Sequence, residues 1–482
     1  MDLTKLTELT AISPIDGRYR DKVEQLSTYF NEYALIKNRL LLEVNWLIAL
    51  TDPFIALTDP FGETSEETGV RETIGKELNF LLDVVLNFSL EDAVRVKEIE
   101  RATNHDMKAV EYWLRERLLG TSLEDLIATI HAALTSEDVN SVAYALMIGD
   151  ALQYVVGPAF DRLNNALGER TVQYADMPML ALTHGQPASP TTVGKEMNIF
   201  KSRFERQRKS LDNYRLPVKW SGTTGTHAAL LAFCPEINPA KFCRKFIEDG
   251  IRFNLRPSGI QLECVSVTTQ VEPHDGLAEL FHIMIRINLI LIDLSRDMWG
   301  YISRGVFVQK AIAGEVGSST MPHKVNPIDF ENAEGNLGVA NALFSHFAEK
   351  LPISRFQRDL SDSTVMRNIG VAFAHSLLAY ELLLNGLQKI SPNEEVLRKE
   401  LDAHWEVLME PAQMILRREG VADAYEIVKK HSRGKGSMRR REYMDFVAYI
   451  AAELSLSPLV IKEISELSPH TYVGLAPELA KL

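Results

Sequence analysis

Residues 276–302 read GLAELFHIMIRINLILIDLSRDMWGYI, and their large apolar side chains recur every three or four positions. This period is typical of an α-helix that buries one face. At 1.5 Å per residue the helix would be about 40 Å long, which is too long for a small globular domain and typical of a helical bundle. The residues that define the period are Leu277, Leu280, Phe281, Met284, Ile287, Leu291, Leu294 and Met298.

Several other segments carry similar apolar stripes, so we predict a mostly α fold. They lie near residues 137–168, 194–215, 331–350 and 363–390. Patterns typical of strands are scarce, and residues 251–255 are the one candidate. Loops are predicted where proline and glycine cluster, in residues 51–69, 177–190, 221–226 and 314–327.

The length of the chain and the order of its helices predict three domains. At 482 residues the chain exceeds what one hydrophobic core usually accommodates. We expect an N-terminal helical domain in residues 1–125, a central long-helix bundle domain in 126–390 and a C-terminal helical domain in 391–482.

Composition limits the partners and the compartment. A formal net charge of -13 argues against a general nucleic-acid or acidic-membrane binder, so an anionic ligand would need a local cationic pocket. Three cysteines without metal-ligand spacing favour reduced thiols and the cytoplasm. The N-terminus lacks a secretory pattern, and residues 283–294 are too short to span a membrane. The tail Ala480-Lys481-Leu482 resembles a Ser-Lys-Leu peroxisomal address, which is the alternative location.

Residues 314–327, GEVGSSTMPHKVNP, form neither a regular helix nor a central strand. Glycine permits unusual backbone angles, and Pro322 and Pro327 interrupt helices, so a loop is predicted. It would present Ser318, Lys324 and Asn326 as polar groups. Such compositions usually mark a solvated surface loop, but the order of the residues here indicates function.

Residues 317–327 resemble, at every fixed position, the G-S-S-x-M-P-x-K-x-N-P signature of the fumarase/aspartase superfamily, whose members eliminate fumarate from succinyl-bearing substrates. With residues 328–332 included, the stretch is similar to that of the bacterial-type adenylosuccinate lyase family. Four further segments are similar to that family in the same order: SPIDGRY at 13–19, TNHD at 103–106, THGQPA at 183–188 and TQVEPHD at 269–275. The resemblance covers nearly the full chain.

The resemblance implies a three-domain fumarase/aspartase-like fold and a homotetramer whose active sites each draw on three protomers. It implies β-elimination of fumarate from adenylosuccinate, giving AMP, and from the succinyl-aminoimidazole-carboxamide ribotide of purine synthesis (SAICAR), giving the carboxamide ribotide (AICAR). General acid/base chemistry of this kind needs no cofactor, and the sequence has neither a metal-ligand cluster nor a dinucleotide loop.

The reaction needs one base and one acid. His184 is the expected acid, because imidazole titrates near neutral pH and the family counterpart has that role; a hydrogen-bonding role is the alternative. Ser318 matches the family's base. Neighbouring backbone N–H groups and the Lys324 ammonium would stabilise its alkoxide and the aci-carboxylate formed when the proton leaves. Alternatively, Ser318 binds a carboxylate, as Ser319 is expected to do.

The family's substrate-binding positions also have counterparts here. Arginine suits a phosphate or carboxylate because its planar fork makes bidentate bonds. Asn104 or Asp106, and the pair Thr135 and Ser136, also suit helix capping, a role compatible with binding. The full expected set is Arg18, Tyr19, Asn104, His105, Asp106, Thr135, Ser136, Gln270, Ser319, Lys324, Val325, Asn326, Asn332, Arg358, Ser363, Thr364 and Arg367.

Two features complicate this interpretation. Residues 221–228, SGTTGTHA, depart from the Gly-Ala-Val-Gly-Asn-Tyr-Asn pattern of the nearest subfamily and lack both asparagines. The basic cluster of residues 433–441 is either a solvated loop, a subunit contact or a polyanion site. Argininosuccinate lyase is the alternative enzyme, which Arg18 and Arg358 argue against. A catalytically silent helical scaffold is the alternative class, although packing alone requires none of His184, Ser318 and Lys324.

Overall fold

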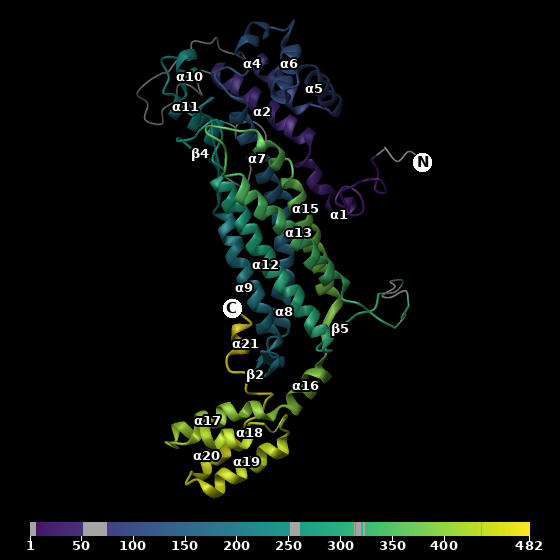
Figure 1. Cartoon of the computed structure of the whole chain (residues 1–482), viewed down its shortest axis with the longest axis vertical. Coiled ribbons are helices and arrows are strands. Elements are labelled where there is room, and N and C mark those ends of the chain that lie inside the picture. The colour runs from purple at the N-terminus through teal and green to yellow at the C-terminus, as the bar shows by residue number, and fades with distance from the viewer. Residues whose placement is uncertain are drawn as a thin grey trace. The chain divides into compact units, whose positions relative to one another are not determined.

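The computed structural model describes residues 6–51, 75–250, 261–312, 314, 320–321, 323–434 and 436–482. Helices dominate these residues (Figure 1), which confirms the mostly α prediction. The chain forms two compact units: residues 1–160, 207–288 and 336–378, and residues 161–206, 289–335 and 379–482. The boundaries of the three expected domains stay a prediction.

The N-terminal part of the first unit is built around a nearly fully buried helix, α2. This helix lies against α4, α5 and α6 (Figure 1). Its apolar residues point in all directions, as expected for a core helix. The helices of this part are α1 (Arg20–Val23), η1 (Glu24–Thr28), α2 (Glu32–Thr51), α4 (Gly75–Leu86), α5 (Leu90–Thr103), α6 (Asp106–Leu118) and η2 (Glu124–Thr129).

The expected long helices are present, with some changes at their ends. The helix predicted at 276–302 is confirmed as α12 (Asp275–Ser303), and the one predicted at 363–390 is interrupted between Met366 and Ile369. The segment predicted at 137–168 contains a π-helical turn. These helices are α7 (Ser136–Ala151), the π turn η3 (Leu152–Val156), α8 (Gly157–Gln173), α9 (Val193–Asp212), α12, α13 (Ile328–Lys350), α14 (Ser361–Met366) and α15 (Ile369–Lys389).

Aromatic rings join the long helices within the first unit. The Phe344 ring on α13 lies 5.5 Å from that of Phe281 on α12 and 5.2 Å from that of Phe373 on α15. Phe373 also stacks on Phe30, which precedes α2, at 5.5 Å. Such pairs add to the free energy of burial. In the second unit, an ion pair joins Arg296 of α12 to Glu334 of α13 at 2.8 Å.

The strands are short and pair two by two. The hairpin of β1 (Pro178–Thr183) and β2 (Gln186–Thr192) lies where we predicted a loop, so that prediction was wrong over most of residues 177–190. A two-stranded ribbon has only edge strands, which tolerate the prolines that suggested a loop. The other pairs are β3 (Arg215–Val218) with β4 (Gln261–Cys264), and β5 (Phe307–Gln309) with β6 (Ile390–Pro392). The strand predicted at 251–255 lies outside the described residues.

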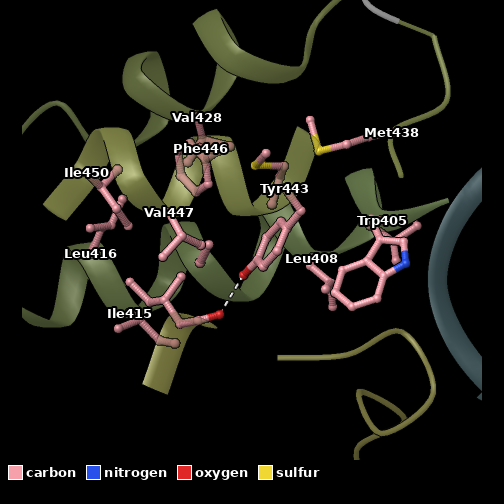
Figure 2. Close-up of a cluster of buried hydrophobic side chains, with 14 of the residues drawn as sticks. Trp405, Leu408, Ile415, Leu416, Val428, Met438, Tyr443, Phe446, Val447 and Ile450 are labelled. Carbon is pink, nitrogen blue, oxygen red and sulfur yellow. Dashed lines mark hydrogen bonds between the residues drawn. The ribbon is translucent and has the colours of Figure 1, made fainter. Parts of the chain in front are cut away.

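The C-terminal helices enclose a hydrophobic cluster within the second unit (Figure 2). Leu408, Ile415 and Ile450 are buried in it, and the Tyr443 hydroxyl donates to the Ile464 carbonyl at 2.8 Å. Leu180 of β1 belongs to the same cluster, so the hairpin packs against these helices. They are α16 (Glu394–Ala403), η6 (Trp405–Leu408), α17 (Met409–Arg418), α18 (Ala424–Ser432), α19 (Arg440–Glu453), α20 (Pro458–Ser465) and α21 (Ala476–Leu479).

Smaller helical elements complete the first unit. They are α10 (Ala228–Phe233), α11 (Pro239–Lys245) and the π-helical η4 (Phe246–Gly250). All three cysteines are free, and Cys234 and Cys243 are buried.

Two helical stretches, Ser136–Gln173 and Ser361–Lys389, are long and apolar enough to span a membrane. The sequence analysis predicted helices over most of both stretches but did not consider either as a membrane span. Their apolar windows are 78% and 72% buried inside the protein, so core packing accounts for their composition.

Candidate functional site

Two arginine side chains from distant parts of the first unit meet at the carboxylate of Asp106, the first residue of α6. Arg39 on α2 donates from Nη2 to Asp106 Oδ2 at 2.8 Å, and Arg367 donates from Nη2 to the same oxygen at 3.0 Å. Burial by itself raises the pKa of Asp106, but the two guanidiniums and the Met107 N–H outweigh it and lower the pKa to about 2. Asp106 therefore holds Arg367 as a permanent anion.

The same arrangement continues from Arg39 toward Arg358. Arg39 Nε donates to Asn140 Oδ1 at 2.9 Å, and Asn140 Nδ2 donates to Glu137 Oε1 at 2.7 Å. Arg358 Nη2 donates to that Glu137 oxygen at 2.8 Å. Together with Asp106 and Arg367 these residues form a continuous hydrogen-bonded series, which we call the arginine chain: Arg367, Asp106, Arg39, Asn140, Glu137 and Arg358.

Ser363 and Thr364 lie on α14, just before Arg367. Arg367 Nη1 donates to the Ser363 carbonyl at 3.1 Å and also contacts its hydroxyl oxygen. Arg367 Nε donates to Glu32 Oε1 at 3.1 Å. The structure therefore brings Ser363, Arg367 and Asp106 together, as the sequence analysis expected of a common site.

The segment Asn104-His105-Asp106 connects α5 to α6. Asn104 ends α5 with a positive φ of 52°, and the His105 ring, not Asp106, caps α6 by accepting the Lys108 N–H at Nδ1, at 3.1 Å. The Nδ1 atom is thereby the acceptor, which leaves the proton of a neutral ring on Nε2. His105 is exposed, so this nitrogen is available to a ligand.

Thr135 and Ser136 begin α7, as expected, and a buried ion pair holds them. The Thr135 N–H donates to Asp138 Oδ2 at 2.8 Å. Lys219 Nζ donates to Asp138 Oδ1 at 2.5 Å, and both side chains are completely buried. The Ser221 N–H donates to the same oxygen at 2.8 Å.

The Asp138 carboxylate therefore fixes the segment that departs from the family pattern, residues 221–228. Lys219 Nζ also donates to the Gly222 carbonyl at 3.0 Å, and the hydroxyl oxygens of Ser221 and Thr268 lie 2.9 Å apart. Gln270 follows Thr268 by two residues. Its backbone N–H donates to the carbonyl of Gln357, the residue before Arg358, at 3.2 Å.

His131 lies four residues before Thr135 and was not singled out by sequence. Its φ is 59°, and its Nδ1 lies 2.6 Å from Oε1 of the buried Glu43. Burial lowers the pKa of His131, but Glu43 and Glu111 outweigh this and raise it above the ordinary value.

Two pockets border the arginine chain. One, with a volume of about 20 Å³, is lined by Arg39, Tyr144, His274 and Ser363 among others. The other, of about 220 Å³, is lined by Phe30, Leu35, Met147 and Arg367 among others. Arg39 Nη1, the Tyr144 hydroxyl and His274 Nε2 are buried without a hydrogen-bond partner among the described residues. Burial raises the pKa of Tyr144 to about 12, so its hydroxyl keeps its proton. The first pocket therefore combines these polar groups with the carboxylates of Glu137 and Asp362, and the second combines apolar side chains with Glu32 and Arg367.

Arg18 and Tyr19 precede α1 in the first unit. Arg18 is exposed, and its guanidinium carbon lies 5.8 Å from the centre of the Tyr19 ring. Within the described residues, neither side chain bonds to the arginine chain.

The remaining predicted residues belong to the second unit. His184 and Gly185 form the two-residue turn of the β1–β2 hairpin, with φ of 54° and 72°, and His184 is exposed. Ser189 of β2 and Tyr472 both donate to Glu410 of α17, which ties the hairpin to the C-terminal helices.

The signature loop is described only in part. Lys324 is exposed, and the Val325 carbonyl accepts from Gln309 Nε2 at 3.0 Å. Asn326 follows in the loop and Asn332 lies on α13. Ser318 and Ser319 lie outside the described residues.

The basic cluster at 433–441 is exposed on the second unit. Arg439 occupies the N-cap of α19, and the Arg440 guanidinium carbon lies 6.0 Å from the Trp405 ring centre. Lys435 lies outside the described residues.

Sequence reasoning missed the residues that link the predicted ones: Arg39, Glu137, Asn140, Asp138 and Lys219. One signal was present, because Arg39 and Lys219 are charged residues inside apolar runs. Fully buried charges of this kind are almost always paired.

Comparison with known proteins places this arrangement in a family. A family model described as "Lyase" matches residues 17–341, and one described as "Adenylosuccinate lyase C-terminal" matches residues 354–473. Adenylosuccinate lyases from Legionella pneumophila (strain Corby) and Escherichia coli (strain K12) are 46% and 43% identical to this chain. The alignments cover 99% and 98%, respectively, of both chains.

Solved structures confirm the expected superfamily fold. A fumarate lyase from Mesorhizobium sp. BNC1 has a TM-score of 0.70 at 16% identity, with 95% of this chain and 96% of that chain covered. A 3-carboxy-cis,cis-muconate lactonizing enzyme from Pseudomonas putida has a TM-score of 0.70 at 17% identity, with 96% and 97% covered. By its fold and its relatives, the chain belongs to the adenylosuccinate lyase family of the fumarase/aspartase superfamily.

Proposed function

We propose that this protein cleaves adenylosuccinate to AMP and fumarate, and SAICAR to AICAR and fumarate. The observation that carries the proposal is the arginine chain, which places two guanidiniums among residues that match the substrate site of a family sharing nearly the full chain. A nucleotide monophosphate carries about two negative charges, so it suits a local cationic site in an otherwise acidic protein.

The phosphate would be held by the arginines and the neighbouring hydroxyls. Arg358 and Arg367 would contribute bidentate bonds to the phosphate, and Ser363 and Thr364 would add hydroxyl donors. Arg18 and Tyr19 belong to the same proposal as a further cationic and hydroxyl pair. The pocket beside Arg367, lined by Phe30, Leu35 and Met147, offers apolar surface of the kind that a purine covers.

In the chemical step, Ser318 would remove the proton from the carbon next to a carboxylate of the succinyl group. As the carbon–nitrogen bond breaks, His184 would protonate the leaving nitrogen, so no water is consumed. Lys324 would stabilise both the serine alkoxide and the aci-carboxylate intermediate. The His184 position at the tip of a hairpin supports this role, because it leaves the ring open to a ligand.

The remaining matched positions would orient the succinyl nucleotide. Their neutral groups can form hydrogen bonds with the ribose, the base and the second carboxylate of the substrate. The carboxylate among them can accept hydrogen bonds from the ribose or the base. They are Asn104, His105, Asp106, Thr135, Ser136, Gln270, Ser319, Val325, Asn326 and Asn332.

The proposal includes a homotetramer with shared active sites, located in the cytoplasm. It requires no cofactor and no metal, since proton transfer and charge stabilisation are supplied by side chains. Nucleic acid and membranes are not among the proposed partners.

The test is a fumarate-release assay with the purified protein, coupled to a second enzyme that consumes fumarate. We expect release from adenylosuccinate and from SAICAR, and none from argininosuccinate. Release from argininosuccinate alone would assign the alternative enzyme. Release from none of the three would contradict the proposal and favour the scaffold hypothesis.

A further inference from the structure

The two arginines at the ends of the arginine chain lie outside the long helices. Arg358 lies in an irregular segment between α13 and α14, and Arg367 follows the six-residue helix α14. Long side chains of this kind are rotamer-rich when nothing holds them. The Arg358 guanidinium is held by Glu137 at 2.8 Å. That of Arg367 is held by Asp106 at 3.0 Å, beside Glu32 and the Ser363 carbonyl, each at 3.1 Å.

Those two carboxylates lie in the first turns of different helices, α7 and α6. Both helix starts are held by one side chain, that of Arg39. Its Nη2 bonds Asp106 at 2.8 Å, and its Nε bonds Asn140 at 2.9 Å; Asn140 in turn bonds Glu137. Arg39 is 2% exposed. The fully buried Leu40 and Leu42 follow it on α2, so core packing fixes its backbone.

We propose that Arg39 is a positioning residue that sets the separation and orientation of Arg358 and Arg367, and thereby the affinity for the substrate's phosphate. The inference rests on the proposed function. Arg39 acts through Asp106 and through Asn140 and Glu137, and its planar fork is what allows one side chain to bond both branches. A lysine at this position would keep the charge but lose the two-directional geometry.

The test compares ligands that differ only in the phosphate. Affinities for AMP and for adenosine are measured by calorimetry on the full-length protein, with Arg39→Gln beside wild type. We expect the Kd for AMP to rise roughly tenfold or more and the Kd for adenosine to change less than about twofold. A general loss of structure would weaken both ligands alike. An unchanged ratio of the two affinities in a folded Arg39→Gln protein would overturn the inference.

Asn38→Ala is the matched control, because Asn38 is the preceding residue of α2 and its side chain bonds only to the Ala34 carbonyl of the same helix, at 2.8 Å. It should leave the AMP-to-adenosine ratio at the wild-type value. Arg39→Lys should restore folding but little of the ratio.

Asn140→Ala keeps the inference testable if Arg39→Gln does not fold. It removes the link between Arg39 and Glu137 in the arginine chain without leaving an unpaired buried charge. It should raise the Kd for AMP selectively and leave the Kd for adenosine near the wild-type value. An Asn140→Ala protein with the wild-type ratio would contradict the inference.

The two proposals fail in different ways. A wild-type protein that releases no fumarate from adenylosuccinate and binds AMP no better than adenosine contradicts the proposed function, and the inference falls with it. A wild-type protein that releases fumarate, with variants that keep its phosphate preference, contradicts the role of Arg39 alone.

Discussion

Asp138 connects the start of α7 to residues 219–222 through one carboxylate. It accepts the Thr135 N–H, the Ser221 N–H and the Lys219 ammonium at 2.5–2.8 Å, and both charged side chains are completely buried. A buried ion pair adds little net stability compared with apolar residues, but removing one partner leaves an uncompensated charge.

We therefore expect Lys219→Met to lower the free energy of unfolding by about 3–5 kcal/mol, because Asp138 stays buried without its cation. Urea denaturation at fixed protein concentration measures the change. Lys399→Met is the control, since Lys399 pairs with Glu395 on the surface, where both side chains are more than 60% exposed. It should leave the midpoint near the wild-type value. Equal shifts in the two variants would contradict this account.

The pKa of Asp106 predicts a dependence of stability on acid. Because the folded pKa is about 2 and the ordinary value is 3.8, the ionised group stabilises the fold above pH 3.8, and this contribution is lost as the pH falls toward 2. The stability difference between wild type and Asp106→Asn should be constant above about pH 5 and shrink between about pH 4 and pH 2. Denaturant titrations across this range measure it, and a difference that stays constant down to pH 2 would refute the depressed pKa.

Among single residues of the arginine chain, the sequence identified Arg358, Arg367 and Asp106. It did not identify Arg39, Asn140 and Glu137. Arg358 and Arg367 stand within motifs, whereas Arg39 does not. Asp106 and Asn140 are 67 and 101 positions away from Arg39 along the chain, and Glu137 is 221 positions away from Arg358. Local patterns carry no information on such pairs, which become neighbours only when the helices pack.

Among the elements, the β1–β2 hairpin combines an unusual backbone with the proposed acid. His184 has a φ of 54°, a conformation that glycine, asparagine and aspartate adopt more readily than other residues. Asparagine at this position would therefore keep the turn while removing the titrating ring.

We expect His184→Asn to lower kcat by about 10²- to 10⁴-fold, as loss of a general acid does, with the thermal midpoint at or above the wild-type value. His184→Ala should lose as much activity and also some stability, since alanine tolerates the turn less well. Fumarate-release kinetics and calorimetric scans separate the two effects. A His184→Asn protein with near-normal kcat would overturn the assignment of the acid.

The close approach of α15 to the residues before α2 depends on a glycine. A Cβ at Gly370 would overlap that of Phe30 and lie 2.8 Å from its Cγ, whereas a Cβ at Gly338 on α13 would meet nothing within 4 Å. Gly370→Ala should therefore cost about 1–3 kcal/mol, as overpacking does. Gly338→Ala should be neutral or stabilise by up to about 1 kcal/mol, because alanine favours the helix. Thermal unfolding of both variants measures the difference, and similar midpoints would show that Phe30 moves aside freely.

The elements themselves were predictable where one physical signal dominated. The apolar period located α12 to within one residue at each end, because a helix of this length repeats its pattern many times. The hairpin was missed because proline and glycine suggest a loop, and six-residue strands are too short to outweigh that signal. The break between α14 and α15 was missed because the apolar pattern runs across it.

At the scale of the whole molecule, exposed apolar side chains on α12 support the proposed tetramer. Leu289 and Trp299 are 51% and 48% exposed, and they lie on a helix that buries its other large apolar residues, such as Leu280, Met284 and Leu291. Large apolar groups at such positions commonly mark an interface between subunits.

The double variant Leu289→Glu and Trp299→Glu should lower the mass measured by light scattering from that of a tetramer toward that of smaller species. Leu459→Glu is the control, because Leu459 is 79% exposed on the short helix α20. It should leave the mass unchanged. A tetramer that persists in the double variant would place the interface elsewhere.

The discontinuity of the first unit bears on how the protein is made. Its three segments end at residues 160, 288 and 378, and Phe30 stacks on Phe373. A ribosome that has released residue 160 must add more than two hundred residues before the last segment is complete, which takes about 10–40 s at about 5–20 residues per second. During that time Arg39 lacks its link to Arg358, and apolar helix faces lack their cover. The nascent chain is therefore a strong client for chaperones, and truncation before residue 378 yields a fragment prone to aggregation rather than a smaller folded protein.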